Sequence, residues 1–296
     1  MPTDAQRPDL KGAGLGSLEQ GTKIVIEEGR PRVHVESPLM MESLLDKALI
    51  DRTYQEKEVP ILPDVHLVHL GGRGIIDRGS EVLLPLIDEI VRARPAHKIL
   101  IGVGGGIRER HTFALAIDLG LPTGGLAQLT GVICKQNATM VYYLLARHGG
   151  VRISRENFHK LPYYLGAGGI PVVVDMPPYH FWEHLPRVGR IPTHRPDTGS
   201  YLISEVYSCR SCIFVKDVDG LYDKDPKTNP RAEFIPQIGA DELLRRGLPD
   251  LPIEPAVLEI LKLARNRKEI RIVNGLVPGN LTRALDGEDV GTVVHQ

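Results

Sequence analysis

The chain has 296 residues, 42% of them hydrophobic, and its formal net charge at pH 7 is −1. This length and this apolar content are enough for one large α/β domain or two small ones with a sizeable core. Because the charge is balanced and no block of Lys and Arg with interleaved aromatic residues occurs, the sequence argues against a general nucleic-acid-binding surface. Any anion-binding site must therefore be local.

Residues 1–20 are polar and rich in glycine, without the apolar core of a signal peptide, and no uninterrupted apolar stretch of about 18 residues follows. The sequence therefore predicts a cytoplasmic protein with no membrane contact. Cys134 is isolated, and Cys209 and Cys212 form one CxxC pair that lacks the second pair of a zinc ribbon. We interpret all three as reduced thiols.

Residues 1–60 lack the regular alternation that follows and mix Gly, Pro and charged residues, with one helix-like stretch at 41–49. We interpret this segment as an N-terminal arm, which either wraps around a neighbouring subunit or forms a tail without its own core. The remaining residues, 61–296, are interpreted as the main domain.

From residue 65 onward, short apolar runs alternate with segments of helical periodicity. The alternation predicts an α/β fold, a three-layer sandwich in which helices cover both faces of a mainly parallel open sheet. In chain order, the predicted elements are a strand at 65–70, a helix at 82–92, a strand at 98–101, helices at 108–119 and 127–148, a strand at 172–174, a helix at 201–207, and strands at 212–215 and 270–273.

Two glycine turns follow predicted strands directly, Gly71-Gly72 and residues 102–106, and both precede helices. Glycine lets backbone N–H groups approach an oxyanion, and the start of a helix favours negative charge. The second turn does not complete G-x-G-x-x-G, because the last position falls on Ile107 or Glu109, and no P-loop lysine follows. Either turn alone could be a plain tight turn, but two in succession favour a nucleotide or oxyanion site.

A further glycine-containing segment, residues 215–226, reads VKDVDGLYDKDP. Together with the Gly-Gly pair after the first strand, Asp197 upstream and the segment 274–292, this string resembles the amino-acid-kinase superfamily, and bacterial UMP kinases in particular. The resemblance covers about residues 65–294 in the same order. It implies that residues 61–296 form an amino-acid-kinase-like domain that binds ATP with Mg²⁺.

Some segments are not general features of these kinases and resemble the subunits of molybdenum storage proteins more closely. They include Asp77-Arg78-Gly79, Gln136-Asn137, Pro177-Pro178-Tyr179-His180, residues 191–199 and residues 273–279. This narrower resemblance implies a cage, a hexamer, built from copies of the chain or from the chain and a related sister subunit. It also implies that molybdate is held inside the cage as polyoxomolybdate clusters.

Position 69 departs from the kinase pattern. In the kinases that the chain resembles, a lysine two residues before the Gly-Gly pair contacts the transferring phosphate, whereas this chain has His69. A histidine of ordinary pKa is mostly neutral near pH 7 and would stabilise the charge of the transition state less well than lysine. The exchange therefore weakens the case for phosphoryl transfer but not for nucleotide binding.

The resemblance also implies roles for the residues that would hold the phosphates. Asp197 would organise this end of the site and approach Mg²⁺, and backbone donors would come from Gly71, Gly72, Gly104 and Gly105. The alternative for Asp197 is a simple N-cap of the helix predicted at 201–207.

The segment after the strand at 212–215 would grip the base and ribose of the nucleotide. The contacts implied by the resemblance are Lys216, Asp217, Gly220, Tyr222 and Asp225. The alternative is a tight Asp-Gly turn without a ligand.

Candidate contacts for the metal oxide gather in two loop-rich stretches. Mo(VI) in an oxo cluster is a hard, anionic centre, so Arg, protonated His and direct N or O ligands suit it. The candidate metal-site residues are Glu156, His159, His180, His184 and His194, with Arg108, Arg110, His111 and Arg195 as further cationic contacts. For each histidine alone, a surface position or a satisfied core position is the alternative.

Three functions remain open at this stage. The first is a nucleotide-binding storage protein for molybdate, in which ATP binding, with or without slow hydrolysis, drives loading. The second is a kinase that transfers phosphate from ATP to UMP, which a lysine at position 69 would have favoured. The third is a silent partner subunit that binds nucleotide but neither catalyses nor stores metal.

Overall fold

The computed structural model describes residues 22–35, 58–177, 186, 188–226, 228–248 and 250–296. The chain divides into two compact units, residues 1–59 and 60–296. In the first unit, β1 (Thr22–Glu27) and β2 (Arg30–Val35) form an antiparallel hairpin. Its turn, Glu28-Gly29, has positive φ at both residues, which suits the twist of a two-residue hairpin. The sequence analysis does not predict this hairpin, and the helix-like stretch 41–49 lies outside the described residues.

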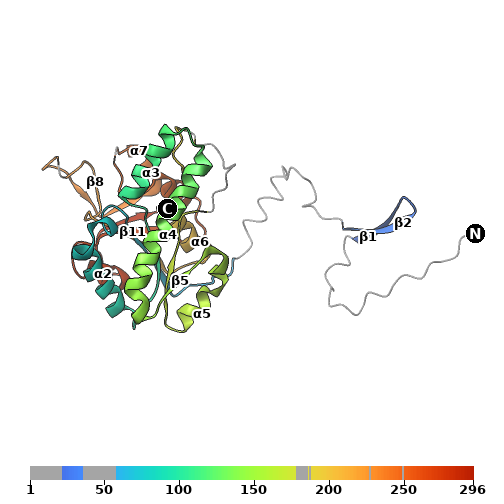
Figure 1. Cartoon of the computed structure of the whole chain (residues 1–296), viewed down its shortest axis with the longest axis horizontal. Helices are drawn as coiled ribbons and strands as arrows, with labels where there is room; N and C mark the ends of the chain where they lie inside the picture. The colour runs from blue at the N-terminus through green and yellow to red at the C-terminus, as the bar shows by residue number, and fades with distance from the viewer. Residues whose placement is uncertain (1–21, 36–57, 178–185, 187, 227, 249) are drawn as a thin grey trace, which may run out of the picture. The chain divides into compact units, whose positions relative to one another are not determined.

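The second unit is built on an eight-stranded sheet in the order β10-β12-β11-β7-β3-β4-β6-β5 (Figure 1). All neighbours in it are parallel except β11 and β12, which confirms the predicted mainly parallel sheet. Its strands are β3 (Val65–Leu70), β4 (Lys98–Val103), β5 (Gly150–Ile153), β6 (Ile170–Val173), β7 (Ser211–Lys216), β10 (Gln237–Gly239), β11 (Glu269–Asn274) and β12 (Thr292–His295); β8 (Leu221–Tyr222) and β9 (Phe234–Ile235) form a separate ribbon.

Helices cover both faces of the sheet, as a three-layer sandwich requires. The helices are α2 (Ser80–Ala93), α3 (Ile107–Asp118), α4 (Thr123–Leu145), α5 (Leu161–Gly166), α6 (Pro196–Val206), α7 (Ala240–Arg246), α8 (Pro255–Leu261) and α9 (Asn280–Leu285), with short 3-10 turns η2 (Ile76–Arg78), η3 (Ala146–His148) and η4 (Arg155–Lys160). Apolar side chains of α2, α4 and α9 belong to one core, and those of α5 to α8 belong to the other. Within the described residues, no helix is both long and apolar enough to span a bilayer.

Alternation along the central strands explains why two cores form. In β3, Leu67 points into one core and Val68 and Leu70 into the other; in β7, Phe214 and Val215 are divided in the same way. Both faces are buried, so the strands read as continuous apolar runs. Because β3 lies between β4 and β7 and all three are parallel, the segments that follow them meet at one edge of the sheet.

The helix predicted at 201–207 begins earlier in the structure, at Pro196. Proline fits the first turn of a helix because its fixed φ is helical and its missing N–H has no partner there. The N–H groups that remain are capped by a glutamate from a distant segment, as described below. Local sequence alone therefore places this helix start too late.

Glu89 of α2 caps another helix in the same manner. Its buried carboxylate accepts hydrogen bonds from Gly279 N at 3.2 Å, Thr282 N at 2.7 Å and Thr282 Oγ1 at 3.0 Å. These donors belong to the start of α9, so one side chain ties α2 to the last helix of the sandwich. A buried donor that loses its partner is costly.

We expect Glu89→Ala to lower the free energy of unfolding by about 2–3 kcal/mol, because it leaves several donors at the start of α9 without an acceptor. Urea denaturation followed by circular dichroism measures this change. The matched control is Asp88→Ala, which removes an exposed neighbouring carboxylate and should change stability little. Equal losses in both variants would contradict the capping role.

Candidate functional site

A cleft of about 1020 Å³ opens where the segments after β3, β4 and β7 meet. Its walls include both glycine turns, the start of α6 and the loop after β7. The expected site residues His69, Gly71, Gly72, Gly104, Gly105, Asp197, Lys216, Asp217, Gly220, Tyr222 and Asp225 all line it. The topology therefore gathers in one cleft residues that the sequence holds far apart.

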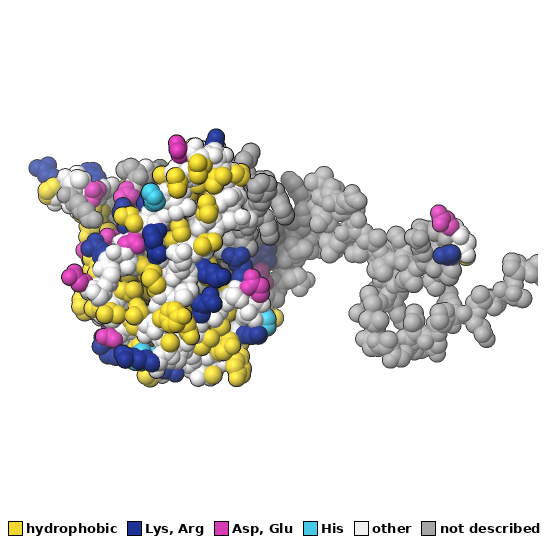
Figure 2. All heavy atoms as spheres, viewed as in Figure 1, with side chains coloured by type: hydrophobic (Ala, Val, Ile, Leu, Met, Phe, Trp, Pro, Cys, Tyr) yellow, Lys and Arg dark blue, Asp and Glu magenta, His cyan; other side chains and the backbone are white. Residues whose placement is uncertain are grey.

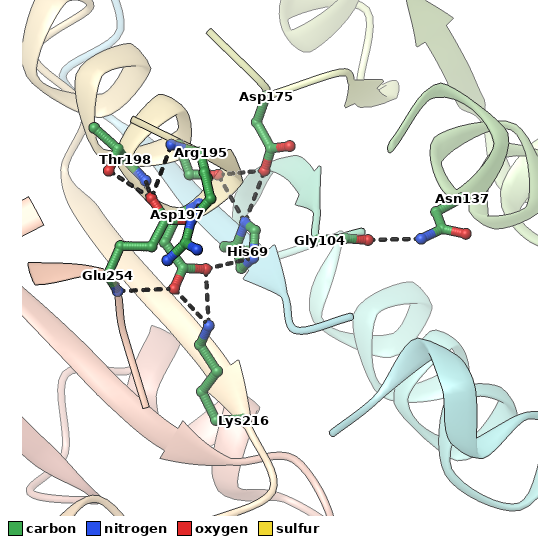
Figure 3. A network of polar contacts seen from close by, with 10 residues as sticks. His69, Gly104, Asn137, Asp175, Arg195, Asp197, Thr198, Lys216 and Glu254 are labelled. Carbon is green, nitrogen blue, oxygen red and sulfur yellow. Dashed lines mark hydrogen bonds and ion pairs between the residues drawn. The ribbon is translucent and has the colours of Figure 1, made fainter. Parts of the chain in front are cut away.

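His69 lies at the bottom of this cleft, between two aspartates (Figure 3). It is 1% exposed; Nδ1 lies 2.7 Å from Asp175 Oδ2 and 3.0 Å from Ser200 Oγ, and Nε2 lies 2.9 Å from Asp197 Oδ1. Only a doubly protonated imidazole can donate from both nitrogens. Burial alone would lower the pKa of His69, but Asp175 and Asp197 raise it to about 9. The expectation of a neutral imidazole is therefore wrong.

Room for this arrangement comes from Gly102, which pairs in register with His69 on the neighbouring strand. A Cβ on Gly102 would lie 2.4 Å from Ser200 Oγ and 2.6 Å from Asp175 Oδ2. The absence of a side chain at this position lets both partners reach the imidazole. Gly102 belongs to the second glycine turn, whose pattern favours an oxyanion site, and no sequence pattern identifies Asp175 or Ser200.

Asp197 lies in the first turn of α6 and links the two cationic side chains of the site. Lys216 Nζ donates to both carboxylate oxygens of Asp197, at 2.8 and 2.9 Å. Asp197 Oδ1 also makes the contact with His69 described above. Burial pushes the pKa of Asp197 upward, but Lys216 and His69 outweigh it and lower the pKa below its usual value. Arg195 occupies the N-cap position, so the alternative role of Asp197 as a simple N-cap is wrong.

Glu254 caps the same helix from a segment 57 positions further along the chain. Its carboxylate accepts from Arg195 N, Asp197 N, Thr198 N and Thr198 Oγ1, and these distances lie between 2.6 and 3.1 Å. The backbone N–H of Glu254 in turn donates to Asp197 at 3.3 Å. No local sequence pattern indicates that Glu254 caps this helix, and sequence reasoning missed this role.

Glu109 of α3 is a second carboxylate of the cleft that the sequence analysis did not select. Burial, together with the nearby Glu254 and Asp197 carboxylates, raises its pKa to about 7. Glu109 is therefore partly protonated near neutral pH and can exchange a proton there. The sequence holds one sign of this role, since Glu109 lies only three residues after the last glycine of the second turn.

The glycine turns supply fewer donors than expected. The N–H of Gly71 donates to Val215 O and that of Gly104 to Leu70 O, both at 2.9 Å, so these two cannot serve a ligand. In the described part of the chain, the N–H groups of Gly72 and Gly105 have no protein acceptor. The turns also touch, because a Cβ on Gly72 would lie 2.2 Å from the nitrogen of Gly106.

The loop after β7 is held in place by contacts with η2 and β12. Arg78 Nη2 lies 3.0 Å from Asp217 Oδ2, and a Cβ on Gly220 would lie 2.2 Å from Thr292 Oγ1. Tyr222 and Asp225 lie further along the cleft wall. Lys216, by contrast, is ion-paired with Asp197 at the start of α6.

Three of the five candidate metal-site residues lie in the described part of the chain. Glu156 and His159 are exposed on η4, His194 is exposed before α6, and none of the three lines the cleft. His180 and His184 lie outside the described residues. Across the ranges that the structure describes, no three His, Cys, Asp or Glu side chains are arranged to hold a metal ion.

The fold and this cleft define a class of protein. The profile of the amino acid kinase family matches residues 65–274, and the chain belongs to that family. Molybdenum storage protein subunit beta of Azotobacter vinelandii is 45% identical over 260 residues, which cover 88% of this chain and 96% of that protein. Uridylate kinase of Methanothermobacter thermautotrophicus is 28% identical over 237 residues, covering 77% of this chain and 97% of the kinase.

Two solved structures agree with the fold. Uridylate kinase from Archaeoglobus fulgidus superposes with a TM-score of 0.62 at 21% identity, covering 78% of this chain and 99% of the kinase. UMP kinase from Bacillus anthracis superposes with a TM-score of 0.61 at 20% identity, covering 79% and 96%. At these identities the likeness concerns the fold alone, and it confirms the predicted amino-acid-kinase fold.

The buried imidazolium predicts how stability depends on pH. The folded chain keeps a proton on His69 up to a pKa of about 9, whereas the unfolded chain loses it near 6.5. The free energy of unfolding should therefore contain a contribution of about 3 kcal/mol that is complete below about pH 6.5 and disappears as the pH rises through about 9. Urea denaturation across this range measures it as the difference between wild type and His69→Asn.

The control for this experiment is His111→Asn, which removes an exposed histidine of α3 and should retain the decline of the wild type. If His69→Asn declines in parallel with the wild type, the imidazole is neutral in the folded chain and the charge assignment is wrong.

Proposed function

We propose that this chain is a nucleotide-binding subunit of an assembly that stores molybdenum as oxide clusters. The observation that carries the proposal is the 45% identity, over 88% of the chain, to a molybdenum storage protein subunit. The likeness to uridylate kinases is weaker, at 28% over 77% of the chain. The two assignments share a fold and differ in what the cleft does with its nucleotide.

The cleft suits ATP bound with Mg²⁺. Lys216 offers a cationic donor, and the N–H groups of Gly72 and Gly105 offer neutral ones, so we assign the phosphates to this end. We assign the base and ribose to the wall that holds Tyr222 and Asp225. Mg²⁺ is usually held by substrate phosphates and one or two carboxylates, a role that Glu109 at the cleft wall fits, so a preformed cage is not required.

The kinase alternative draws support from one observation, the positive charge on His69 at the position of the family lysine. Against it, both N–H groups of His69 are directed at aspartates and none remains for a phosphate. This favours binding, with or without slow hydrolysis, over efficient transfer to UMP.

We also propose that the chain works in an oligomer, in line with the word subunit in the name of its relative. Figure 2 shows hydrophobic side chains gathered on the face where Figure 1 places α3 and α4. Exposed apolar residues on these helices include Leu115, Ile117, Val132 and Tyr143. A hexamer, with copies of itself or with a sister subunit and with residues 1–60 as an arm, is the proposed form, and the cytoplasm is its proposed location.

Within such an assembly, the candidate metal-site residues Glu156, His159, His180, His184 and His194 remain proposed contacts of the oxide cluster. A cluster enclosed by several subunits would take a few contacts from each. A group of three ligands within one chain is then not needed.

The decisive experiment is elemental analysis for molybdenum after the purified chain is incubated with molybdate, with and without Mg-ATP, alongside an assay for UMP-dependent release of ADP. We expect many molybdenum atoms per chain, dependent on ATP, and no response to UMP. UMP-stimulated ADP release without molybdenum would establish the kinase instead. The absence of both molybdenum and UMP-dependent ADP release would favour the silent partner subunit.

A point variant tests the assignment of the phosphate end. Replacing Lys216→Met should weaken Mg-ATP binding roughly tenfold to a hundredfold, because a charge-assisted hydrogen bond is lost. Isothermal titration calorimetry measures this, with the fold checked by circular dichroism. The control is Lys268→Met, an exposed lysine outside the cleft, which should bind like the wild type. Equal affinity in the two variants would place the phosphates elsewhere.

A further inference from the structure

Asn137 is a fully buried amide in the middle of α4. Its Nδ2 donates to Gly104 O at 2.6 Å and to Gly105 O at 3.1 Å, and Figure 3 shows the side chain reaching toward the second glycine turn. A buried amide is costly unless it is satisfied. Here, both of its donor positions are spent on two consecutive carbonyl groups of one loop.

Arg108 fixes which end of this amide faces the loop. Its Nη2 donates to Asn137 Oδ1, and its Nη1 donates to Gln136 Oε1 at 3.0 Å. Because a guanidinium can only donate, the oxygen of the amide must face Arg108 and the NH₂ must face the carbonyls. The orientation of Asn137 is therefore determined by chemistry.

The two hydrogen bonds orient whole peptide groups. In a planar trans peptide the C=O and the following N–H point in opposite directions. When Asn137 draws the carbonyls of Gly104 and Gly105 toward α4, the N–H groups of Gly105 and Gly106 must point away from α4. Gly104, Gly105 and Gly106 line the cleft, whereas no described residue of α4 does, so this direction leads to the cleft.

Both N–H groups are available for a ligand. In the part of the chain that the structure describes, neither Gly105 N nor Gly106 N donates to a protein acceptor. The nitrogen of Gly106 also lies beside Gly72, whose N–H has no acceptor within the same ranges. The three donors lie where the two glycine turns touch, and Lys216 lies beside Gly71, since a Cβ on Gly71 would be 3.2 Å from Lys216 Cδ.

We propose that Asn137 is a positioning residue that holds the N–H groups of Gly105 and Gly106 toward the cleft, where with Gly72 they bind the terminal phosphates of a nucleoside triphosphate. Arg108 acts indirectly, by holding the amide of Asn137 in this orientation. This inference rests on the proposed nucleotide binding and deepens it. It also replaces the donor set expected from the sequence, since Gly71 and Gly104 are occupied by backbone carbonyls.

The test compares Asn137→Asp with wild type in titrations with Mg-ATP, tripolyphosphate and adenosine. Asp keeps the size and loses the NH₂, so the carbonyls of the loop are no longer held. We expect the affinity for Mg-ATP and tripolyphosphate to fall at least tenfold, with adenosine binding unchanged. A purely structural role would weaken all three ligands together, and that result would overturn the proposal, as would unchanged affinities.

Two further measurements keep the proposal testable if Asn137→Asp folds poorly. Arg108→Gln leaves Asn137 in place but removes its anchor, and it should reduce triphosphate affinity by a smaller factor. The control is Thr130→Val, which removes a buried hydroxyl of α4 that donates to Leu126 O, and it should bind like the wild type. An Arg108→Gln variant that also binds like the wild type would contradict the proposal.

Direct observation in the wild-type chain separates this inference from the proposed function. The amide resonances of Gly105 and Gly106 should shift on titration with tripolyphosphate, even if ATP itself does not bind. A chain that binds no ATP but shows these shifts would refute the proposed nucleotide binding and support the positioned donors. Shifts confined to other residues would overturn the inference.

Discussion

The structure of the cleft depends on one buried carboxylate, Asp197, shared between His69 and Lys216. Ions buried in this way are tolerated only when each is paired, and removing one partner leaves an uncompensated charge. The three groups come from β3, α6 and β7, so the ion pairs hold these elements in register at the edge of the sheet. Glu254 completes the arrangement by capping the helix that carries Asp197.

The charges of this end of the cleft are nearly balanced. His69, Lys216 and Arg195 face the carboxylates of Asp175, Asp197 and Glu254. A triphosphate therefore meets no surplus of positive charge, and its own charge must be offset by a metal ion and by neutral N–H donors. For the proposed nucleotide, this balance favours the Mg²⁺ complex over the free nucleotide and gives the neutral donors of the glycine turns a role in binding.

The sequence was sufficient for five strands of the eight-stranded sheet, because apolar runs mark buried strands, but not for β5, β10 and β12. The resemblance to the amino-acid-kinase superfamily identified many of the residues that line the cleft, but not Glu109 or Glu254. The sequence could not reveal contacts between distant segments. Asp175 and Glu254 stand in stretches without a motif, and each acquires its role only when a neighbouring strand or helix brings it to His69 or to α6. For the same reason the start of α6 was placed too late and the charge of His69 was judged wrongly.

The exchange of lysine for histidine can now be understood as a change in donor number. Lysine has three N–H donors on a flexible chain, so one can bind an aspartate while others reach a phosphate. Imidazolium has two, at fixed angles, and both are spent on Asp175 and Asp197. The site keeps a positive charge but loses the mobile donor that a lysine would supply at this position. Under the proposed function, such a cleft would hold a nucleotide rather than transfer its phosphate.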